Sequence, residues 1–239
     1  MIPPSTALNP SRSLDRLLAE IQFLQSAARF RELPAPEVPE IAFAGRSNAG
    51  KSTALNVLVN RRRLAFASKT PGRTRLINLF ALTDPEGEVG RLVDLPGYGY
   101  AAVDATTQRL WKTELSKYLG ERRNLAGLIL VTDIRHALGP LDQQMLAWFA
   151  PRGLPIHVLL TKADKLNRQE QNRAMSKVAA FLDAHPSRSP QIQWSHSCFS
   201  GLKRTGKEQV LDVMAAWLGL SRPGLAQIPS DPHVSGPTI

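Results

Sequence analysis

The sequence predicts an α/β fold in which short apolar strands alternate with amphipathic helices. Apolar runs of strand length recur at 39–44, 125–132 and 155–160, and helical patterns lie between them. Continuous apolar runs of this kind are typical of parallel strands that are covered on both faces. A glycine-containing loop follows the first run and opens a helix. The 239 residues are enough for one domain of ordinary core size with tails.

The composition narrows the cellular setting. The formal net charge is +10, which favours a polyanionic partner, with nucleic acid the first candidate; a solvated basic surface without a partner is the alternative. The single cysteine, Cys198, cannot form an internal disulfide and agrees with a reducing cytoplasm. No apolar run approaches the roughly 18 residues of a membrane span, and the N-terminus does not resemble an export signal. We therefore expect a cytoplasmic protein without a membrane partner.

The predicted organisation has four parts. These are a disordered N-terminus (1–12), a helix with a proline-rich spacer (13–38), one domain (39–219) and a disordered C-terminal tail (220–239). Ser13 is placed to cap a helix that runs to about Phe30. One face of that helix is apolar and carries Leu14, Leu17, Leu18, Ile21 and Leu24.

The first chemical motif is the segment Gly45–Ser52, which fits the phosphate-binding pattern G-x-x-x-x-G-K-[ST]. It lies between the 39–44 strand and a helix at 51–58, whose N-terminus would face the phosphates. Lys51 is expected to reach the β- and γ-phosphate oxygens, and the Ser52 hydroxyl to hold Mg²⁺. The alternative is a strand-to-helix turn that binds nothing.

A basic segment at 60–75 follows this helix. It has too many charges and turn formers for a core element, and its position is that of a nucleotide-switch segment, although a plain solvated loop is the alternative. Thr74 is then a candidate second hydroxyl ligand to Mg²⁺. The positive charges of the segment are Arg61, Arg62, Arg63, Lys69, Arg73 and Arg75.

A predicted β-hairpin comes next and ends in a second motif. Its strands are 76–82 and 89–93, and the second one runs into Asp94-Leu95-Pro96-Gly97. At this distance after a phosphate-binding loop, D-x-x-G indicates that Asp94 acts on Mg²⁺ through water and that the Gly97 N–H senses a γ-phosphate. The segment Tyr98–Ala102 is expected to continue as a flexible switch.

The remaining elements alternate in the same way. Predicted helices are 106–120, 141–149, 168–184 and 207–218, and predicted strands are 125–132, 155–160 and 191–197. His136 is expected at the surface or in packing rather than as a catalytic base, and Cys198 as a packed thiol.

The third motif, Thr161-Lys162-Ala163-Asp164, selects the base. A carboxylate at Asp164 can accept hydrogen bonds from the N1–H and the exocyclic amine of guanine, which adenine does not offer, while the Lys162 methylenes cover the ring. The segment 198–203 is expected to support the base with backbone N–H groups. The sequence therefore predicts a GTPase.

The motif set also resembles a known family. The segments GRSNAGKST, KTPGRTR, DLPGYGYA, LLTKADKL and CFSGLKRTG are similar to those of the EngB (YihA/YsxC) family of ribosome-biogenesis GTPases, over about residues 14–219. The resemblance implies a Ras-like P-loop GTPase fold of the TrmE-Era-EngA-EngB-Septin-like class, in which a mostly parallel sheet has one antiparallel edge strand, helices on both faces and an extra N-terminal helix. It also implies GTP, GDP and Mg²⁺ binding and a role in assembling the large ribosomal subunit.

The family's nucleotide site carries over residue by residue. It implies nucleotide contacts at Gly45, Arg46, Ser47, Asn48, Ala49, Gly50, Lys51, Ser52, Gly72, Arg73, Thr74, Arg75, Leu76, Asp94, Leu95, Pro96, Gly97, Thr161, Lys162, Ala163, Asp164, Phe199, Ser200 and Gly201. Ser52 and Thr74 would hold Mg²⁺, and Lys51, Thr74 and Gly97 would act in catalysis. Members often have a second serine where this chain has Gly201, so a side-chain contact is not expected there.

Two expectations concern rate and role. Many small GTPases have glutamine after the D-x-x-G glycine, but this chain has Tyr98, so we expect slow intrinsic hydrolysis that a partner or a cation accelerates. Asn48 resembles the K⁺-ligating asparagine of some GTPases, although it can also simply stabilise the turn; Arg73 and Arg75 are possible catalytic arginines. The expected role is a monomeric switch that docks its basic segments on ribosomal RNA. The alternative is a GTPase that assists tRNA or RNA modification or binds another polyanion.

Overall fold

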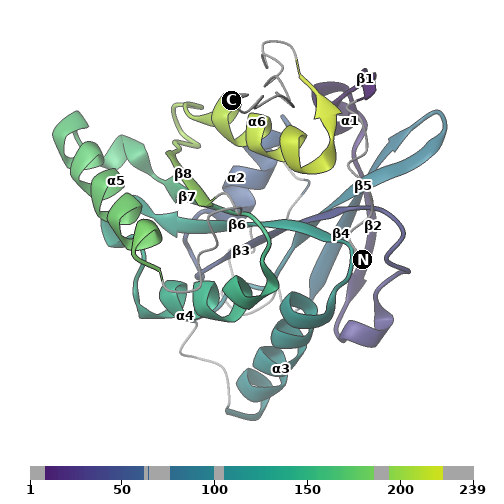
Figure 1. The fold of residues 1–239 in the computed structure, drawn as a ribbon, viewed down its shortest axis with the longest axis horizontal. Helices are drawn as coiled ribbons and strands as arrows, with labels where there is room; N and C mark the ends of the chain where they lie inside the picture. Colours follow the sequence, from purple (N-terminus) through teal and green to yellow (C-terminus); the bar gives the residue numbers. More distant parts are fainter. Residues whose placement is uncertain (1–8, 62–63, 65–75, 100–104, 186–193, 223–239) are drawn as a thin grey trace, which may run out of the picture.

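The computed structural model describes residues 9–61, 64, 76–99, 105–185 and 194–222 (Figure 1). The strands are β1 (Asn9–Ser13), β2 (Gln22–Ala27), β3 (Glu40–Gly45), β4 (Ile77–Asp84), β5 (Gly87–Asp94), β6 (Leu125–Asp133), β7 (Ile156–Thr161), β8 (Trp194–Cys198) and β9 (Leu220–Ser221). The α-helices are α1 (Leu14–Glu20), α2 (Lys51–Leu58), α3 (Ala105–Glu121), α4 (Pro140–Phe149), α5 (Arg168–Asp183) and α6 (Lys207–Leu218).

The central sheet has the strand order β2-β4-β5-β3-β6-β7-β8. Strands β5, β3, β6, β7 and β8 are mutually parallel, and β4 is antiparallel to both of its neighbours. The expected fold class is thereby confirmed with one difference. The antiparallel strand is not at the edge, because β2 pairs outside it with its backbone donors and acceptors.

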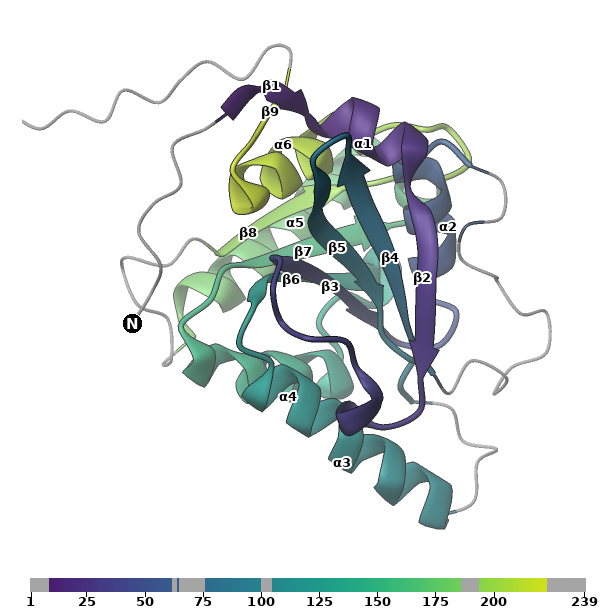
Figure 2. The same cartoon turned by 90° about the vertical axis from the view of Figure 1, so that its right-hand side faces the viewer.

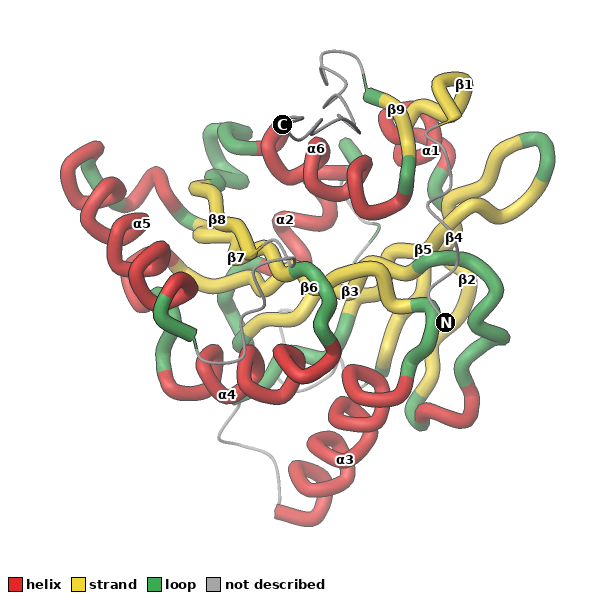
Figure 3. The backbone as a smooth tube through the Cα atoms, viewed as in Figure 1, coloured by secondary structure: helices red, strands yellow, loops and turns green. Residues whose placement is uncertain are grey.

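Helices cover both faces of the sheet (Figures 1 and 2). Because side chains alternate across each strand, β3 contributes Ala42 and Ala44 to one buried cluster and Ile41 and Phe43 to the other. The first cluster packs against α3, α4 and α5, and the second against α1, α2 and α6. The backbone tube in Figure 3 shows the sheet between the two helical layers.

The helix expected over 13–30 is shorter than predicted. It ends at Glu20, and the following residues form β2. Leu14, Leu17 and Leu18 are buried as the helical pattern requires, whereas Leu24, which was assigned to the same face, is 40% exposed on the strand. The free edge of β4 explains the difference, since pairing with it satisfies backbone groups that a longer helix would leave open.

The two ends of the described chain meet, which corrects part of the disorder expected for 1–12 and 220–239. Strand β1 pairs in parallel with β9. Just after β9, Arg222 forms ion pairs with Asp15 of α1 and with Glu208 and Asp212 of α6. Residues 1–8 and 223–239 lie outside the described residues. The N-terminal helix is therefore packed into the domain rather than set apart from it.

No helix among the described residues is long and apolar enough to cross a membrane.

Candidate functional site

Three strand ends of the parallel sheet bring the predicted motifs to one edge. Gly45 of β3 lies opposite Val131 of β6, Asp133 of β6 lies opposite Thr161 of β7, and Phe43 lies opposite Asp94 of β5. Loops that follow the carboxyl ends of neighbouring parallel strands form the ligand sites of open α/β sheets. The three motifs thus converge at the edge where such a site is expected.

The phosphate-binding loop leads directly into α2. Gly50 has φ +94°, a left-handed conformation that favours glycine, and its carbonyl accepts the first helical hydrogen bond from the Ala54 N–H at 2.8 Å. The next residue, Lys51, is buried, and its ammonium pairs with the buried carboxylate of Asp94 at the end of β5. Two buried opposite charges therefore lie at the N-terminus of α2, where the helix dipole favours an anion.

The D-x-x-G segment is bonded to the phosphate-binding loop through its backbone. The Leu95 N–H donates to the Phe43 carbonyl at 3.0 Å, the Tyr98 N–H to the Gly45 carbonyl at 3.2 Å, and the Ser47 N–H to the Tyr98 carbonyl at 2.8 Å. These bonds continue the β3–β5 pairing beyond both strands. Tyr98, the first residue of the expected flexible switch, is thus hydrogen-bonded through both of its backbone groups, and residues 100–104 of that switch lie outside the described part.

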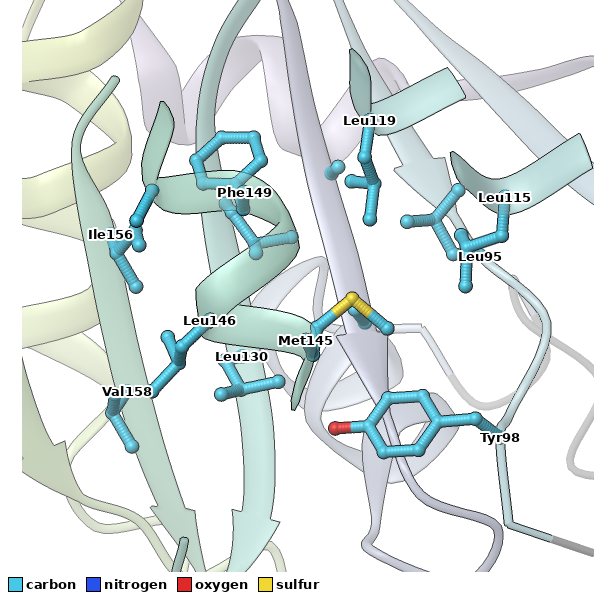
Figure 4. Packing of buried hydrophobic residues seen from close by; sticks show 14 of the residues in the cluster. Leu95, Tyr98, Leu115, Leu119, Leu130, Met145, Leu146, Phe149, Ile156 and Val158 are labelled. Carbon is cyan, nitrogen blue, oxygen red and sulfur yellow. The ribbon is translucent and has the colours of Figure 1, made fainter. Parts of the chain in front are cut away.

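The side chain of Tyr98 is also fixed. It is 4% exposed, and its hydroxyl donates to Asp142 Oδ1 of α4 at 2.6 Å. The other oxygen of Asp142 accepts from the Thr132 hydroxyl and the Gly139 N–H, each at 3.1 Å. Figure 4 shows the Tyr98 ring next to Met145 of α4. Burial raises the pKa of Asp142, and burial next to Asp142 raises that of Tyr98.

Sequence reasoning missed Asp142. An aspartate in the first turn of a helix after Gly-Pro is typical of a helix cap, and Asp142 is one through the Gly139 N–H. Nothing in the local pattern indicates its contact with Tyr98, which lies 44 positions away in the chain.

The segments expected to select the base are brought together. Asp164 Oδ1 accepts from the Ser200 hydroxyl at 2.6 Å, which lowers the pKa of Asp164 and keeps it ionised. The Phe199 N–H donates to the Leu160 carbonyl and the Ala163 N–H to the Phe199 carbonyl, so the two loops form one unit. Ser200, placed in the sequence analysis as a backbone contact, is thus also a support for the carboxylate.

The glycine at 201 has a local cause. A Cβ added to Gly201 would lie 2.6 Å from Thr53 Cγ2 of α2, too close for any other residue without movement. A serine at this position would therefore require Thr53 to move.

Lys162 connects two of the motifs. Its ammonium donates to the Asn48 carbonyl at 2.8 Å and pairs with Asp133 Oδ2 at 3.0 Å. Asp133 also accepts from the Arg135 guanidinium. Burial would raise the pKa of Asp133, but these cationic partners lower it. The Thr161 hydroxyl donates to the Ala49 and Thr132 carbonyls, which ties the third motif to the first.

Other predicted positions are less informative. Residues 72–75, with Thr74 among them, lie outside the described residues, and Leu76 is exposed just before β4. Arg46 contributes backbone to the loop, but a Cβ added to Gly139 would lie 3.6 Å from its guanidinium, so its side chain points toward α4. His136 is exposed, as expected, and Cys198 is a half-buried thiol whose pKa is raised by burial.

The oxygen ligands at this edge of the sheet fit a magnesium ion that is also bound by nucleotide phosphates. The described residues contain no group of three His, Cys, Asp or Glu side chains that could hold a metal ion by themselves. Ser52 in the first turn of α2 and Asp94 at the end of β5 supply a hydroxyl and a carboxylate at the same edge. Mg²⁺ is commonly bound by one or two protein oxygens together with substrate phosphates and water.

Comparisons with known proteins agree with this geometry. A family model described as 50S ribosome-binding GTPase matches residues 40–162. The "Probable GTP-binding protein EngB" of Burkholderia cenocepacia is 49% identical over 216 residues, which cover 90% of this chain and 97% of that protein.

Two solved structures share the fold. A crystal structure of a probable GTP-binding protein engB has a TM-score of 0.59 at 21% identity, covering 75% of this chain and 98% of the other. Era in complex with MgGDPNP and nucleotides 1506–1542 of 16S ribosomal RNA has a TM-score of 0.59 at 19% identity, covering 81% and 60%.

Proposed function

Because the chain belongs to the EngB family of GTP-binding proteins and carries a GTPase domain, we propose that it is a molecular switch that binds GTP and GDP, hydrolyses GTP slowly and acts in assembly of the large ribosomal subunit. The observation that carries the nucleotide part is the buried Lys51–Asp94 pair at the N-terminus of α2. A phosphate bound at this point would be a second anionic partner for the Lys51 ammonium. Asp94 would then be available to act on Mg²⁺.

The phosphate half of the site is assigned to the loop Gly45–Ser52, with Lys51 on the β- and γ-phosphates. Ser52, together with Thr74, would hold Mg²⁺, and Asp94 would act on it through water. When bound, Mg²⁺ neutralises phosphate charge. Thr74 and Gly97 complete the proposed catalytic set.

The base half of the site is assigned to Thr161–Asp164 and Phe199–Gly201. Support comes from the Asp164–Ser200 hydrogen bond, because a carboxylate with one oxygen fixed has its other oxygen directed for a second partner. Guanine offers two adjacent N–H donors to a carboxylate, and adenine does not. We therefore propose selectivity for guanine nucleotides.

Slow hydrolysis is proposed from the residue that follows Gly97. The Tyr98 hydroxyl donates to Asp142 and the side chain is buried, so it does not face a position where it could orient an attacking water. A cation or a partner would have to supply that function. Asn48, which is exposed with φ +65°, is the proposed K⁺ ligand.

The ribosomal part of the proposal rests on family and charge. The chain carries a net charge of +10, and six of its cations lie in the segment 61–75, next to the phosphate-binding helix. Ordering of this segment by a γ-phosphate would couple RNA affinity to the bound nucleotide. The partner proposed is ribosomal RNA of the large subunit.

The test is co-sedimentation of the purified protein with large ribosomal subunits. GDP is compared with a non-hydrolysable GTP analogue at two salt concentrations, after direct titration with a fluorescent guanine nucleotide. We expect binding that needs the GTP analogue and weakens with salt.

Variants sharpen this test. Arg62→Gln with Arg63→Gln should weaken co-sedimentation, whereas Arg168→Gln with Arg173→Gln, which removes the same charge from the exposed face of α5, should not. Nucleotide binding with equal sedimentation in both states would leave a GTPase and overturn the ribosomal role. Absence of nucleotide binding would overturn the whole proposal.

A further inference from the structure

Tyr98, the residue after the glycine proposed to sense a γ-phosphate, is hydrogen-bonded on two sides. Tyr98 exchanges backbone hydrogen bonds with Gly45 and Ser47 on one side, and its hydroxyl bonds Asp142 on the other. Gly97, the residue before it, also lies against the phosphate-binding loop. A Cβ added to Gly97 would lie 3.3 Å from Ser47 Oγ and 3.4 Å from the Ser47 nitrogen.

Asp142 depends on these particular donors. Its side chain is buried, and it accepts hydrogen bonds from Tyr98, Thr132 and the Gly139 N–H, all of which are neutral. No ion pair to Asp142 is present within the described residues, although the positive charge of Arg46 acts on it. A buried carboxylate without a close counter-charge is costly unless its acceptors are filled, so the Tyr98 hydroxyl has a strong preference for this one position.

The fixed position of Tyr98 restricts the peptide before it. Within the described residues the Gly97 N–H donates no hydrogen bond to the protein, while the N–H groups of Leu95 and Tyr98 both do. With respect to the described residues, the Gly97 amide is therefore an open donor, and Gly97 lies against Ser47 of the phosphate-binding loop.

We propose that Tyr98 and Asp142 are positioning residues that hold the Gly97 N–H where a γ-phosphate can accept it, so that their hydrogen bond contributes to the preference for GTP over GDP. This inference rests on the nucleotide-binding function proposed above. It predicts an effect on the γ-phosphate alone, because GDP has no group at the position that Gly97 faces.

A purely structural role is the competing explanation, and the chain contains a matched control for it. Tyr118 of α3 belongs to the same buried cluster, is fully buried and donates its hydroxyl to a buried carboxylate, Glu40, at 3.0 Å. Glu40 begins β3, whereas the Tyr98 backbone is bonded to Gly45 at its end, and these two ends of the strand are about 16 Å apart at the usual rise per residue. Tyr118→Phe therefore removes an equivalent hydroxyl away from the nucleotide.

The experiment measures equilibrium affinities for GDP and for a non-hydrolysable GTP analogue in the presence of Mg²⁺. Tyr98→Phe should lower the affinity for the GTP analogue by about two- to tenfold, the range that one net hydrogen bond supplies, and leave the affinity for GDP unchanged. The ratio of the analogue affinity to the GDP affinity should therefore fall. Thr132→Val, which removes a different donor to Asp142, should lower this ratio by less, and Tyr118→Phe should leave it unchanged.

Each outcome bears on the proposal. An unchanged ratio in Tyr98→Phe, an equal loss for both nucleotides, or a shifted ratio in Tyr118→Phe would overturn it. If Tyr98→Phe does not fold, the Thr132→Val ratio decides in the same way. A wild-type protein that binds neither nucleotide would instead overturn the nucleotide-binding function itself.

Discussion

The two ends of strand β3 each hold a buried carboxylate network, and the two networks are built differently. At the start of the strand, Glu40 accepts from Arg122 at 2.6 and 2.9 Å, from Arg91 at 3.2 Å and from Tyr118 at 3.0 Å. Near its end, within the described residues, Asp142 accepts hydrogen bonds from neutral donors and Asp94 forms an ion pair with Lys51.

This difference suggests separate roles, with the Glu40 network contributing to stability and the network at the other end of β3 suited to ligand binding. The Glu40 network fills its acceptors with two guanidinium groups and leaves no capacity for a ligand, so it can only hold β3, β5 and α3 together. Among the described residues, the network at the other end has one ion pair, Lys51–Asp94, and one carboxylate, Asp142, that forms no ion pair. Charges that are incompletely balanced by the protein are suited to rearrange when an anion and a metal arrive.

The largest effect is expected from Glu40→Gln. It leaves two buried arginines without their shared carboxylate, which should lower the free energy of unfolding by about 3–5 kcal/mol. Urea unfolding measures this loss. Glu88→Gln, which leaves Arg91 paired with Glu40, should cost much less. Guanine-nucleotide affinity measured on the folded fraction should not change. A loss of affinity would contradict the assignment of the Glu40 end of β3 to stability alone.

The next effect is expected from Lys51→Met, which keeps the apolar stem and removes the charge. GTP-analogue affinity should fall by about a hundredfold, or ~3 kcal/mol, because a charged phosphate contact is lost. Isothermal titration measures it, with Lys177→Met, an exposed lysine on α5, as the control. The free energy of unfolding should fall less in Lys51→Met than in Glu40→Gln. A larger fall in Lys51→Met would mean that the main role of Lys51 is to stabilise the fold.

A smaller effect is expected at the link between the phosphate and base loops. Asp133→Asn removes the charge that holds Lys162, so affinity for GDP and for the GTP analogue should fall equally, by about three- to tenfold. Arg135→Gln removes the exposed partner of the same carboxylate and should have little effect. An unequal loss for the two nucleotides would assign Asp133 to the γ-phosphate rather than to Lys162.

The features that depend on nearby residues in the sequence, namely the main strands and the positions of the motifs, could be predicted from the sequence. The alternation of apolar runs predicted the strands, and the spacing of the motifs predicted that Lys51, Asp94 and Asp164 follow strand ends. Strand β2 was not predictable, because Gln22–Ala27 continues a helical pattern and is drawn into the sheet by the open edge of β4. Asp142 and Asp133 were not predictable either. Their partners are far away in the chain or belong to another loop, and a buried carboxylate carries no local signature of its donors.

The smallest effect concerns pH, and it has opposite signs at the two ends. Burial alone would raise the pKa of Glu40, but Arg122 lowers it, so its stabilisation is present above the unfolded value of about 4 and is lost as pH falls. Burial raises the pKa of Asp142, so the folded state binds extra proton and the stability contributed by Asp142 declines as pH rises through that pKa.

Urea unfolding of the wild type, Glu40→Gln and Asp142→Asn between about pH 3.5 and 7 separates these contributions. The stability advantage of the wild type over Glu40→Gln should grow with pH, and its advantage over Asp142→Asn should shrink. If both advantages grew with pH, Asp142 would have to be balanced in the folded state as fully as Glu40 is. The nucleotide end of β3 would then be as self-contained as the other end, and the argument that it rearranges for a ligand would lose its electrostatic basis.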